Sequence, residues 1–181
     1  MRNSKVLFMV QAAMIAAIYV VLTMLANSIG LASQDIQVRF SEALTILPFF
    51  TPAAIPGLFV GCIIGNIVTS CHPIDVIFGS LATLIGALGT YFIAHGFTRP
   101  GDKNYYSKNP LKKWLTPIPP IVANMLIVPH VIAYCYGSDY TLPISTLFVG
   151  AGEVISCFMM GMVLLYALEP HKRAIFAQDQ V

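Results

Sequence analysis

Charged residues are scarce in this chain. Lys, Arg, Asp and Glu together make up 10% of its 181 residues, whereas an ordinary soluble domain contains about 25%. Hydrophobic residues make up 57%. This composition excludes an ordinary soluble domain and is typical of a protein embedded in lipid. Because a helix needs about 20 apolar residues to cross a bilayer, the length allows about six crossings with short loops.

Motifs for catalysis and for metal binding are also absent from the sequence. It contains no GxxxxGK[ST] phosphate loop, HExxH or GxSxG. The four cysteines have no CxxC spacing and no paired histidines at zinc-ligand intervals. We interpret them as small apolar core residues, with a disulfide between Cys71 and Cys135 as the alternative. We therefore predict a non-enzyme, with no catalytic residue, metal or cofactor in this chain.

Long apolar runs predict the membrane spans. The first run is preceded by Arg2 and Lys5 and is longer than the roughly 7 to 15 residues of a signal-peptide core, so we expect a retained helix. The second is too short to cross as a straight helix at about 1.5 Å per residue, which predicts a partial or broken span. We predict one transmembrane domain over 1–181, with spans near 6–29, 40–52, 53–69, 74–97, 117–136 and 143–168.

The distribution of basic residues predicts the orientation. Nine of the ten Lys and Arg precede the first span, lie in loop 98–116 or follow the last span. Since cytoplasmic loops collect Lys and Arg, we predict that both termini are cytoplasmic. The same rule explains the basic loop as a membrane anchor with Tyr105, Tyr106 and Trp114 at headgroup level, so nucleic acid is not an expected partner. The one exception is Arg39.

Polar residues inside the spans are the candidate site residues. An acid in the apolar region costs about 2.5–3.5 kcal/mol on insertion scales, so such a residue usually marks a site or a partner. In the predicted topology these residues fall in the outer half, whereas the inner half has His95 and Glu169 at helix ends. The pattern predicts a cup open to the outside rather than a channel. The candidates are Arg39, Glu42, Asn66, Asp75, Asn124, His130 and Glu153.

Several candidates also have a structural explanation. Glu42 lies three residues after Arg39, a spacing that allows an ion pair on one helix face. Asp75 is placed to cap the fourth span, and His130 can bond to a neighbouring backbone group. Glu153 has no basic residue in its own span, which makes it the strongest candidate for ligand contact.

Small residues recur every four positions in two spans. In the third span we interpret them as an internal packing face, because such spacings let membrane helices approach closely. These residues are Gly57, Gly61 and Gly65. In the first span they form a smooth strip that fits either a neighbouring helix or another subunit. This strip consists of Ala12, Ala13, Ala16 and Ala17.

Three stretches carry a resemblance to a known family: AAMIAAIYVVLT at 12–23, IQVRFSEALTILPFFTPAAIPGLFVGCIIGN at 36–66 and PIDVIFGSLATLIGALGTY at 73–91. They closely resemble the QueT family of queuosine-precursor transporters, which are substrate-binding S components of energy-coupling factor (ECF) transporters. The resemblance implies an all-α, six-helix S-component bundle in the bacterial cytoplasmic (plasma) membrane. It also implies a pocket near the outer face.

The resemblance further implies a mechanism and partners. An S component captures its substrate, docks on a transmembrane coupling subunit and topples to release the substrate inside, while two partner ATPase subunits use ATP. The alanines of the first span resemble the AxxxA motif by which S components meet the coupling subunit. The lack of a nucleotide motif in this chain fits that division of labour.

The implied substrate is a 7-deazaguanine base, such as 7-aminomethyl- or 7-cyano-7-deazaguanine. Its guanine-type edge has adjacent N–H donors, and one carboxylate accepts two of them in parallel. Polarity and depth favour Glu153 for this role, with Glu42 second. The other expected contacts are Asn66 and Asn124 at the edge, Tyr134 stacked on the ring and Asp75 for an aminomethyl cation.

Other functions stay open from the sequence. An S component for another small aromatic vitamin is the nearest alternative, because periodicity does not distinguish one planar ring from another. A stand-alone facilitator or secondary carrier needs a polar path across the membrane, which the sequence does not indicate. An intramembrane enzyme or assembly factor needs a catalytic set, which is equally absent.

Overall fold

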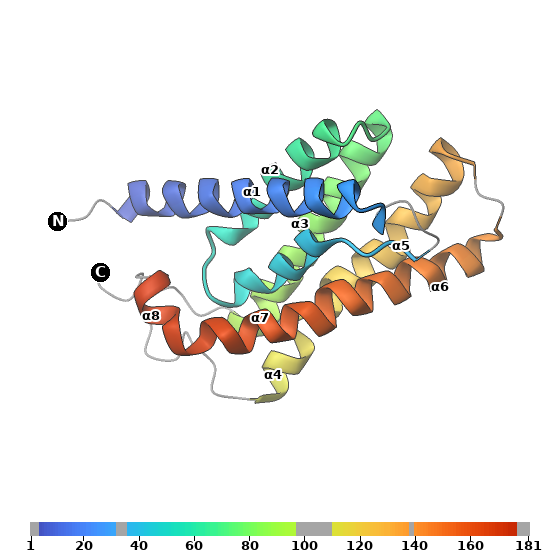
Figure 1. The fold of residues 1–181 in the computed structure, drawn as a ribbon. Helices are drawn as coiled ribbons and strands as arrows, with labels where there is room; N and C mark the ends of the chain where they lie inside the picture. The colour runs from blue at the N-terminus through green and yellow to red at the C-terminus, as the bar shows by residue number, and fades with distance from the viewer. Residues whose placement is uncertain (1–3, 32–35, 97–109, 138–139, 177–181) are drawn as a thin grey trace.

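The computed structural model describes residues 4–31, 36–96, 110–137 and 140–176 (Figure 1). These residues form helices and connecting turns with no strand, which confirms the all-α prediction. The longer helices are α1 (Ser4–Ser28), α2 (Ala54–Val68), α3 (Pro73–His95), α5 (Ile118–Cys135) and α6 (Leu142–Glu153). The shorter elements are η2 (Phe40–Phe49), α4 (Pro110–Leu115), η3 (Val154–Met160), α7 (Gly161–Leu168), η4 (Glu169–His171) and α8 (Lys172–Ile175).

Within the described residues, four helical stretches are long and apolar enough to cross a membrane: Lys5–Ser28, Pro73–His95, Pro110–Cys135 and Leu142–His171. The last consists of α6, η3, α7 and η4 in continuous succession. Two shorter apolar helices, η2 and α2, overlap the second and third apolar runs of the sequence. Large apolar side chains are exposed along the long helices, as expected of surfaces that face lipid.

The second apolar run forms an unusual helix in the middle of the bundle. Element η2 is a 3-10 helix with Pro48 inside it, and its residues from Ser41 to Phe49 are buried. At about 2.0 Å per residue, ten residues extend roughly 20 Å, less than the roughly 30 Å hydrocarbon core. It is therefore a partial span. It packs against α1, α3, α7 and η3, so its irregular backbone is enclosed by protein, as membrane depth requires.

Small residues bring α1 and α2 into close contact. A Cβ atom added to Gly61 would lie 2.8 Å from Tyr19 Cβ and 3.0 Å from Ala16 Cα, and one added to Gly57 would lie 2.7 Å from the Ala12 carbonyl oxygen. Real Cβ atoms do not approach neighbours this closely, so these positions require glycine. The interpretation of the glycine spacing as an internal packing face is confirmed.

The bundle has two distinct ends. The start of α1 and α8 lie at one end, which we call the basic end (Figure 1). At this end Phe50 stacks on Phe176 with ring centroids 5.2 Å apart. Lys113 pairs with Glu169 at this end, with Nζ 2.5 Å from Oε1. Of the predicted basic loop 98–116, the part up to residue 109, with Tyr105 and Tyr106, lies outside the described residues, as does Arg2. The opposite end contains the turns between α2 and α3 and between α5 and α6, and we call it the cavity end.

Candidate functional site

Two adjoining cavities lie at the cavity end. The outer cavity has a volume of about 310 Å³. The polar well has a volume of about 10 Å³, which is enough for about one water molecule. Gln37, Arg39 and Val128 line both of them, so the two cavities adjoin at these residues. Polar residues that line the outer cavity include Thr23, Asn27, Asn66, Thr69, Ser70 and Asp75, together with Tyr136.

Asp75 is the acid of the outer cavity. It lies in the first turn of α3, is buried, and accepts a hydrogen bond from the Tyr136 hydroxyl at 3.2 Å. Partial burial raises the pKa of the Tyr136 phenol, so this hydroxyl keeps its proton at neutral pH. The N-terminus of α3 is capped by His72, whose Nδ1 accepts from the Ile74 amide at 3.3 Å. Asp75 is therefore not needed as the cap and is available to the cavity.

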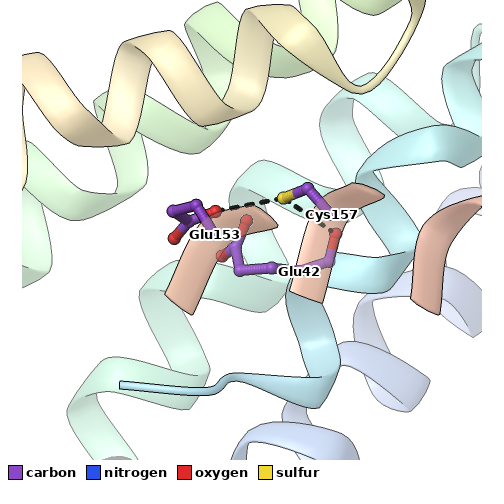
Figure 2. Close-up of side chains that lie close together, drawn as sticks. All are labelled: Glu42, Glu153 and Cys157. Carbon is purple, nitrogen blue, oxygen red and sulfur yellow. Dashed lines mark hydrogen bonds between the residues drawn. The ribbon is translucent and has the colours of Figure 1, made fainter. Parts of the chain in front are cut away.

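Glu42 and Glu153 face each other in the polar well (Figure 2). They are 2% and 8% exposed, respectively. The Tyr19 hydroxyl donates to Glu42 Oε1 at 2.5 Å, whereas Glu42 Oε2 has no regular hydrogen-bond partner within the part of the chain that the structure describes. The Cys157 thiol donates to Glu153 Oε2 at 3.0 Å and to the Glu42 carbonyl oxygen at 3.5 Å. The well thus contains a buried acceptor that a ligand donor would satisfy.

The helices at the well have irregular geometry that aims these side chains. Glu153 ends α6, and the π-helix η3 follows it at once. A π-helix widens the turn and is frequent at functional sites. Here it brings the Ser156 hydroxyl to accept from the Arg39 amide at 3.1 Å. Gly152 lets the backbone of Gln37 approach, because a Cβ at this position would overlap the Gln37 carbonyl oxygen. The start of η2 is therefore fixed against α6 and η3.

The charges around the two cavities do not balance. Among the described residues that line them, Glu42, Asp75 and Glu153 are acids, and Arg39 is the basic residue. Arg39 and Glu42 are close enough to attract each other electrostatically, but they do not form a direct salt bridge within these residues. The Arg39 guanidinium instead donates to Gln37 Oε1 at 3.4 Å. The acids that line the two cavities therefore outnumber the basic residue, which favours a ligand group with a positive charge.

A metal-binding set also exists on geometry alone. Glu42, Glu153 and Cys157 each offer one ligand atom, and these atoms lie within 4.8 Å of one another. However, the Cys157 thiol already donates to two oxygens, and a metal would need the deprotonated sulfur. The existing hydrogen bonds therefore favour a protonated thiol with a structural role.

The structure brings together most of the predicted site residues but not all of them. Arg39, Glu42, Asn66, Asp75, Asn124 and Glu153 line one or both cavities. His130 and Tyr134 lie on the exposed side of α5, where Tyr134 is 79% exposed, and neither lines the outer cavity or the polar well. The aromatic side chain at the outer cavity is Tyr136, two residues further on.

The predicted docking strip divides into two pairs. Ala16 is buried against Gly61, and the Ala12 backbone contacts Gly57, so this pair belongs to the contact between α1 and α2. Ala13 and Ala17 are exposed on the other face of α1. Only the second pair is accessible to another subunit.

Sequence reasoning missed several site residues. Tyr19, Gln37, Thr83 and Tyr136 carry no signal in the sequence, because uncharged polar residues are common near helix ends. Cys157 did carry a signal, since it follows Glu153 by one helical turn and therefore lies on the same face of the helix. The four cysteines are free, and the alternative disulfide between Cys71 and Cys135 is not formed.

Comparisons of the sequence with known proteins found one family and one curated relative that match. Residues 9–170 match the family described as QueT transporter. A curated relative, the "Queuosine precursor transporter QueT" of Lactococcus lactis subsp. cremoris (strain MG1363), is 38% identical over 85 residues. That match covers 47% of this chain and 50% of the relative, about half the length of each. No solved structure matches the chain significantly. The four long apolar helical stretches within the described residues indicate a multi-pass membrane protein. The family match extends over most of the chain, and the chain therefore belongs to the QueT transporter family.

Proposed function

We propose that this chain is the substrate-binding S component of an ATP-driven ECF importer for a queuosine precursor, a 7-deazaguanine base. The observation that carries the proposal is the polar cavity of about 310 Å³ at one end of a QueT-family bundle. This volume is at the small end of ligand pockets, which range from about 300 to 1,000 Å³. The cavity is suited to a compact planar base, and carboxylate, amide and hydroxyl groups line it.

The distribution of charge supports an outward-facing cavity. The described lysines Lys5, Lys112, Lys113 and Lys172 belong to α1, α4 and α8 at or near the basic end. Since cytoplasmic segments collect basic residues, the basic end and both termini are cytoplasmic in this proposal. The two cavities then open toward the outside of the bacterial plasma membrane.

The core of the bundle supports delivery by movement of the whole subunit rather than through a fixed pore. Between the polar well and the basic end, the chain packs buried apolar side chains that include Phe49, Phe50 and Leu165. The buried polar side chains in this region, among them Thr51, Thr90 and His95, form hydrogen bonds to other groups of the protein. A facilitator or ion-coupled carrier would need polar groups that are free to contact the substrate along this path. In the proposed mechanism the S component docks on a coupling subunit and topples, and two partner ATPase subunits use ATP.

The exposed face of α1 is the proposed docking surface. Ala13 and Ala17 present small side chains one helical turn apart, which lets another helix approach closely. Ala12 and Ala16 are occupied by the contact with α2. We therefore assign docking on the coupling subunit to Ala13 and Ala17.

The outer cavity suggests how the ring is held. The Asp75 carboxylate accepts two parallel N–H bonds from a guanine-type edge, and the Asn66 amide supplies a further donor and acceptor. Tyr136 replaces Tyr134 as the aromatic contact, because it lines the cavity and orients Asp75. The base enters from the open side of this cavity with its edge toward α3.

Reconstituted transport tests the proposal. The chain, a coupling subunit and two ATPase subunits in proteoliposomes should accumulate a labelled 7-deazaguanine base only when ATP is present on the ATPase side. Uptake by the chain alone, without the other subunits, would instead establish a facilitator. Guanine, riboflavin and biotin serve as competitors, and displacement by riboflavin or biotin would replace the base with another vitamin as substrate.

A further inference from the structure

The polar well differs from the outer cavity in size and chemistry. Its volume of about 10 Å³ admits one group the size of a water molecule and excludes an aromatic ring. Besides Gln37 and Arg39 at the mouth, its polar walls are Glu42, Thr83, Asn124 and Glu153. A ligand in the outer cavity would reach the well only with a small substituent.

The well contains an unmet hydrogen-bond acceptor. Glu42 is 2% exposed, and its Oε1 atom accepts from Tyr19. The Asn124 amide lies near both acids, but the Oε2 atom of Glu42 has no hydrogen bond of regular geometry among the described residues. Its carboxylate points toward that of Glu153 (Figure 2). An unpaired buried acceptor is costly, and this one is placed so that a donor between the two carboxylates would bond to both.

The charge of the site specifies the donor. Two carboxylates share the well, and a third, Asp75, lies in the outer cavity, against the single guanidinium of Arg39. Buried charges are stable when paired with opposite charge. A cationic donor would neutralise one carboxylate. A neutral acceptor such as a nitrile nitrogen could accept from the Asn124 amide or the Thr83 hydroxyl, but it would leave the excess of carboxylate groups uncompensated.

We infer that the polar well is a subsite for a primary ammonium group of the substrate, so that the chain prefers a 7-aminomethyl-7-deazaguanine to its 7-cyano analogue. This inference rests on the proposed function. The ring occupies the outer cavity with its guanine edge at Asp75, and the aminomethyl arm enters the well between Glu42 and Glu153. Depth in the predicted spans favours Glu153 for the guanine edge and Asp75 for the aminomethyl cation. Because the well is too small for a ring, these two roles are exchanged here. The size of the well also selects against substituents that extend beyond the nitrogen.

Calorimetry with two bases and three proteins tests the subsite. Purified wild-type protein should bind the aminomethyl base about 10- to 100-fold more tightly than the cyano base, the range expected for a charge-assisted bond in a buried site. Glu42→Gln keeps the shape and an acceptor for Tyr19 but removes the charge. It should lower aminomethyl affinity about tenfold or more and leave cyano affinity within about threefold. Glu169→Gln, a matched change at the basic end, should leave both affinities unchanged.

The outcomes separate this inference from the proposed function. If wild-type protein binds both bases equally, the subsite is wrong but the substrate class stands. If it binds neither base, both are wrong. Equal losses for the two bases in Glu42→Gln, with an unchanged unfolding temperature, would mean that Glu42 holds the ring. Loss of the preference after treatment with EDTA would assign the well to a metal ion and overturn the inference. Should Glu42→Gln fail to fold, Glu153→Gln and the wild-type comparison decide the question.

Discussion

Leucine at Ala16 should destabilise the fold, whereas leucine at Ala17 should leave the fold intact and block uptake. The two positions are adjacent in sequence but lie on different faces of α1. Ala16 is 8% exposed, and its Cα lies 3.0 Å from where a Cβ on Gly61 would be. Ala17 is exposed. The matched pair therefore separates internal packing from docking with the same change in side-chain volume.

The expected change in stability depends on the space around each of the two side chains. Overpacking a close helix contact costs about 1–3 kcal/mol, and for a chain of this size each kcal/mol lowers the unfolding temperature by about 2–4 °C. Ala16→Leu should thus lower it by about 2–12 °C. Ala17→Leu adds an apolar side chain to a surface already in lipid, so the free energy of unfolding should change by less than about 0.5 kcal/mol.

Thermal unfolding in detergent, substrate binding and reconstituted uptake together measure the prediction. Ala17→Leu should bind substrate as the wild type does and lose most uptake, because the added side chain separates the two docking helices. Full uptake by Ala17→Leu would remove this face from the docking surface. An unfolding temperature of Ala16→Leu equal to that of the wild type would refute the close contact between α1 and α2.

Two further changes test the polar groups of the cavity end. Asp75→Asn should weaken binding of the base about 10- to 100-fold, because the carboxylate is the proposed partner of the guanine edge. Glu169→Gln serves as the control. If calorimetry finds the same affinity in both variants, Asp75 does not contact the base. Tyr19→Phe deletes the donor to Glu42 Oε1 and should lower the free energy of unfolding by about 1.5–3 kcal/mol, or the unfolding temperature by about 3–12 °C. A thermal melt identical to that of the wild type would show that this hydrogen bond does not stabilise the fold.

Much of the fold could be predicted because lipid imposes simple rules on sequence. Length and apolarity predict where helices lie, and the spacing of Gly57, Gly61 and Gly65 predicts a packing face. The partner of that face was not predictable. Ala12 with Ala16 and Ala13 with Ala17 have identical spacing, and the rotation of α1 that decides which pair meets α2 depends on contacts between helices.

The candidate site was predictable to the level of its charged residues. Glu42, Asp75 and Glu153 stand out because buried acids are costly, and all three line the cavities. Their division between two cavities depends on the 3-10 geometry of η2 and the π-helical turn of η3, which periodicity does not predict. Tyr134 and Tyr136 illustrate the same limit, since both side chains are exposed, at 79% and 52%, but of the two only Tyr136, just beyond the end of α5, lines the outer cavity.

Isothermal titration of the purified protein with 7-aminomethyl-7-deazaguanine, beside guanine, riboflavin and biotin, tests the central claim most directly. The account predicts saturable heat with the 7-deazaguanine base and no comparable binding of riboflavin or biotin. Riboflavin has a larger, tricyclic ring system and a ribityl chain, and the carboxylate chain of biotin would meet the acids that line the two cavities. An absence of heat with any 7-deazaguanine base, or tighter binding of riboflavin or biotin, would contradict it.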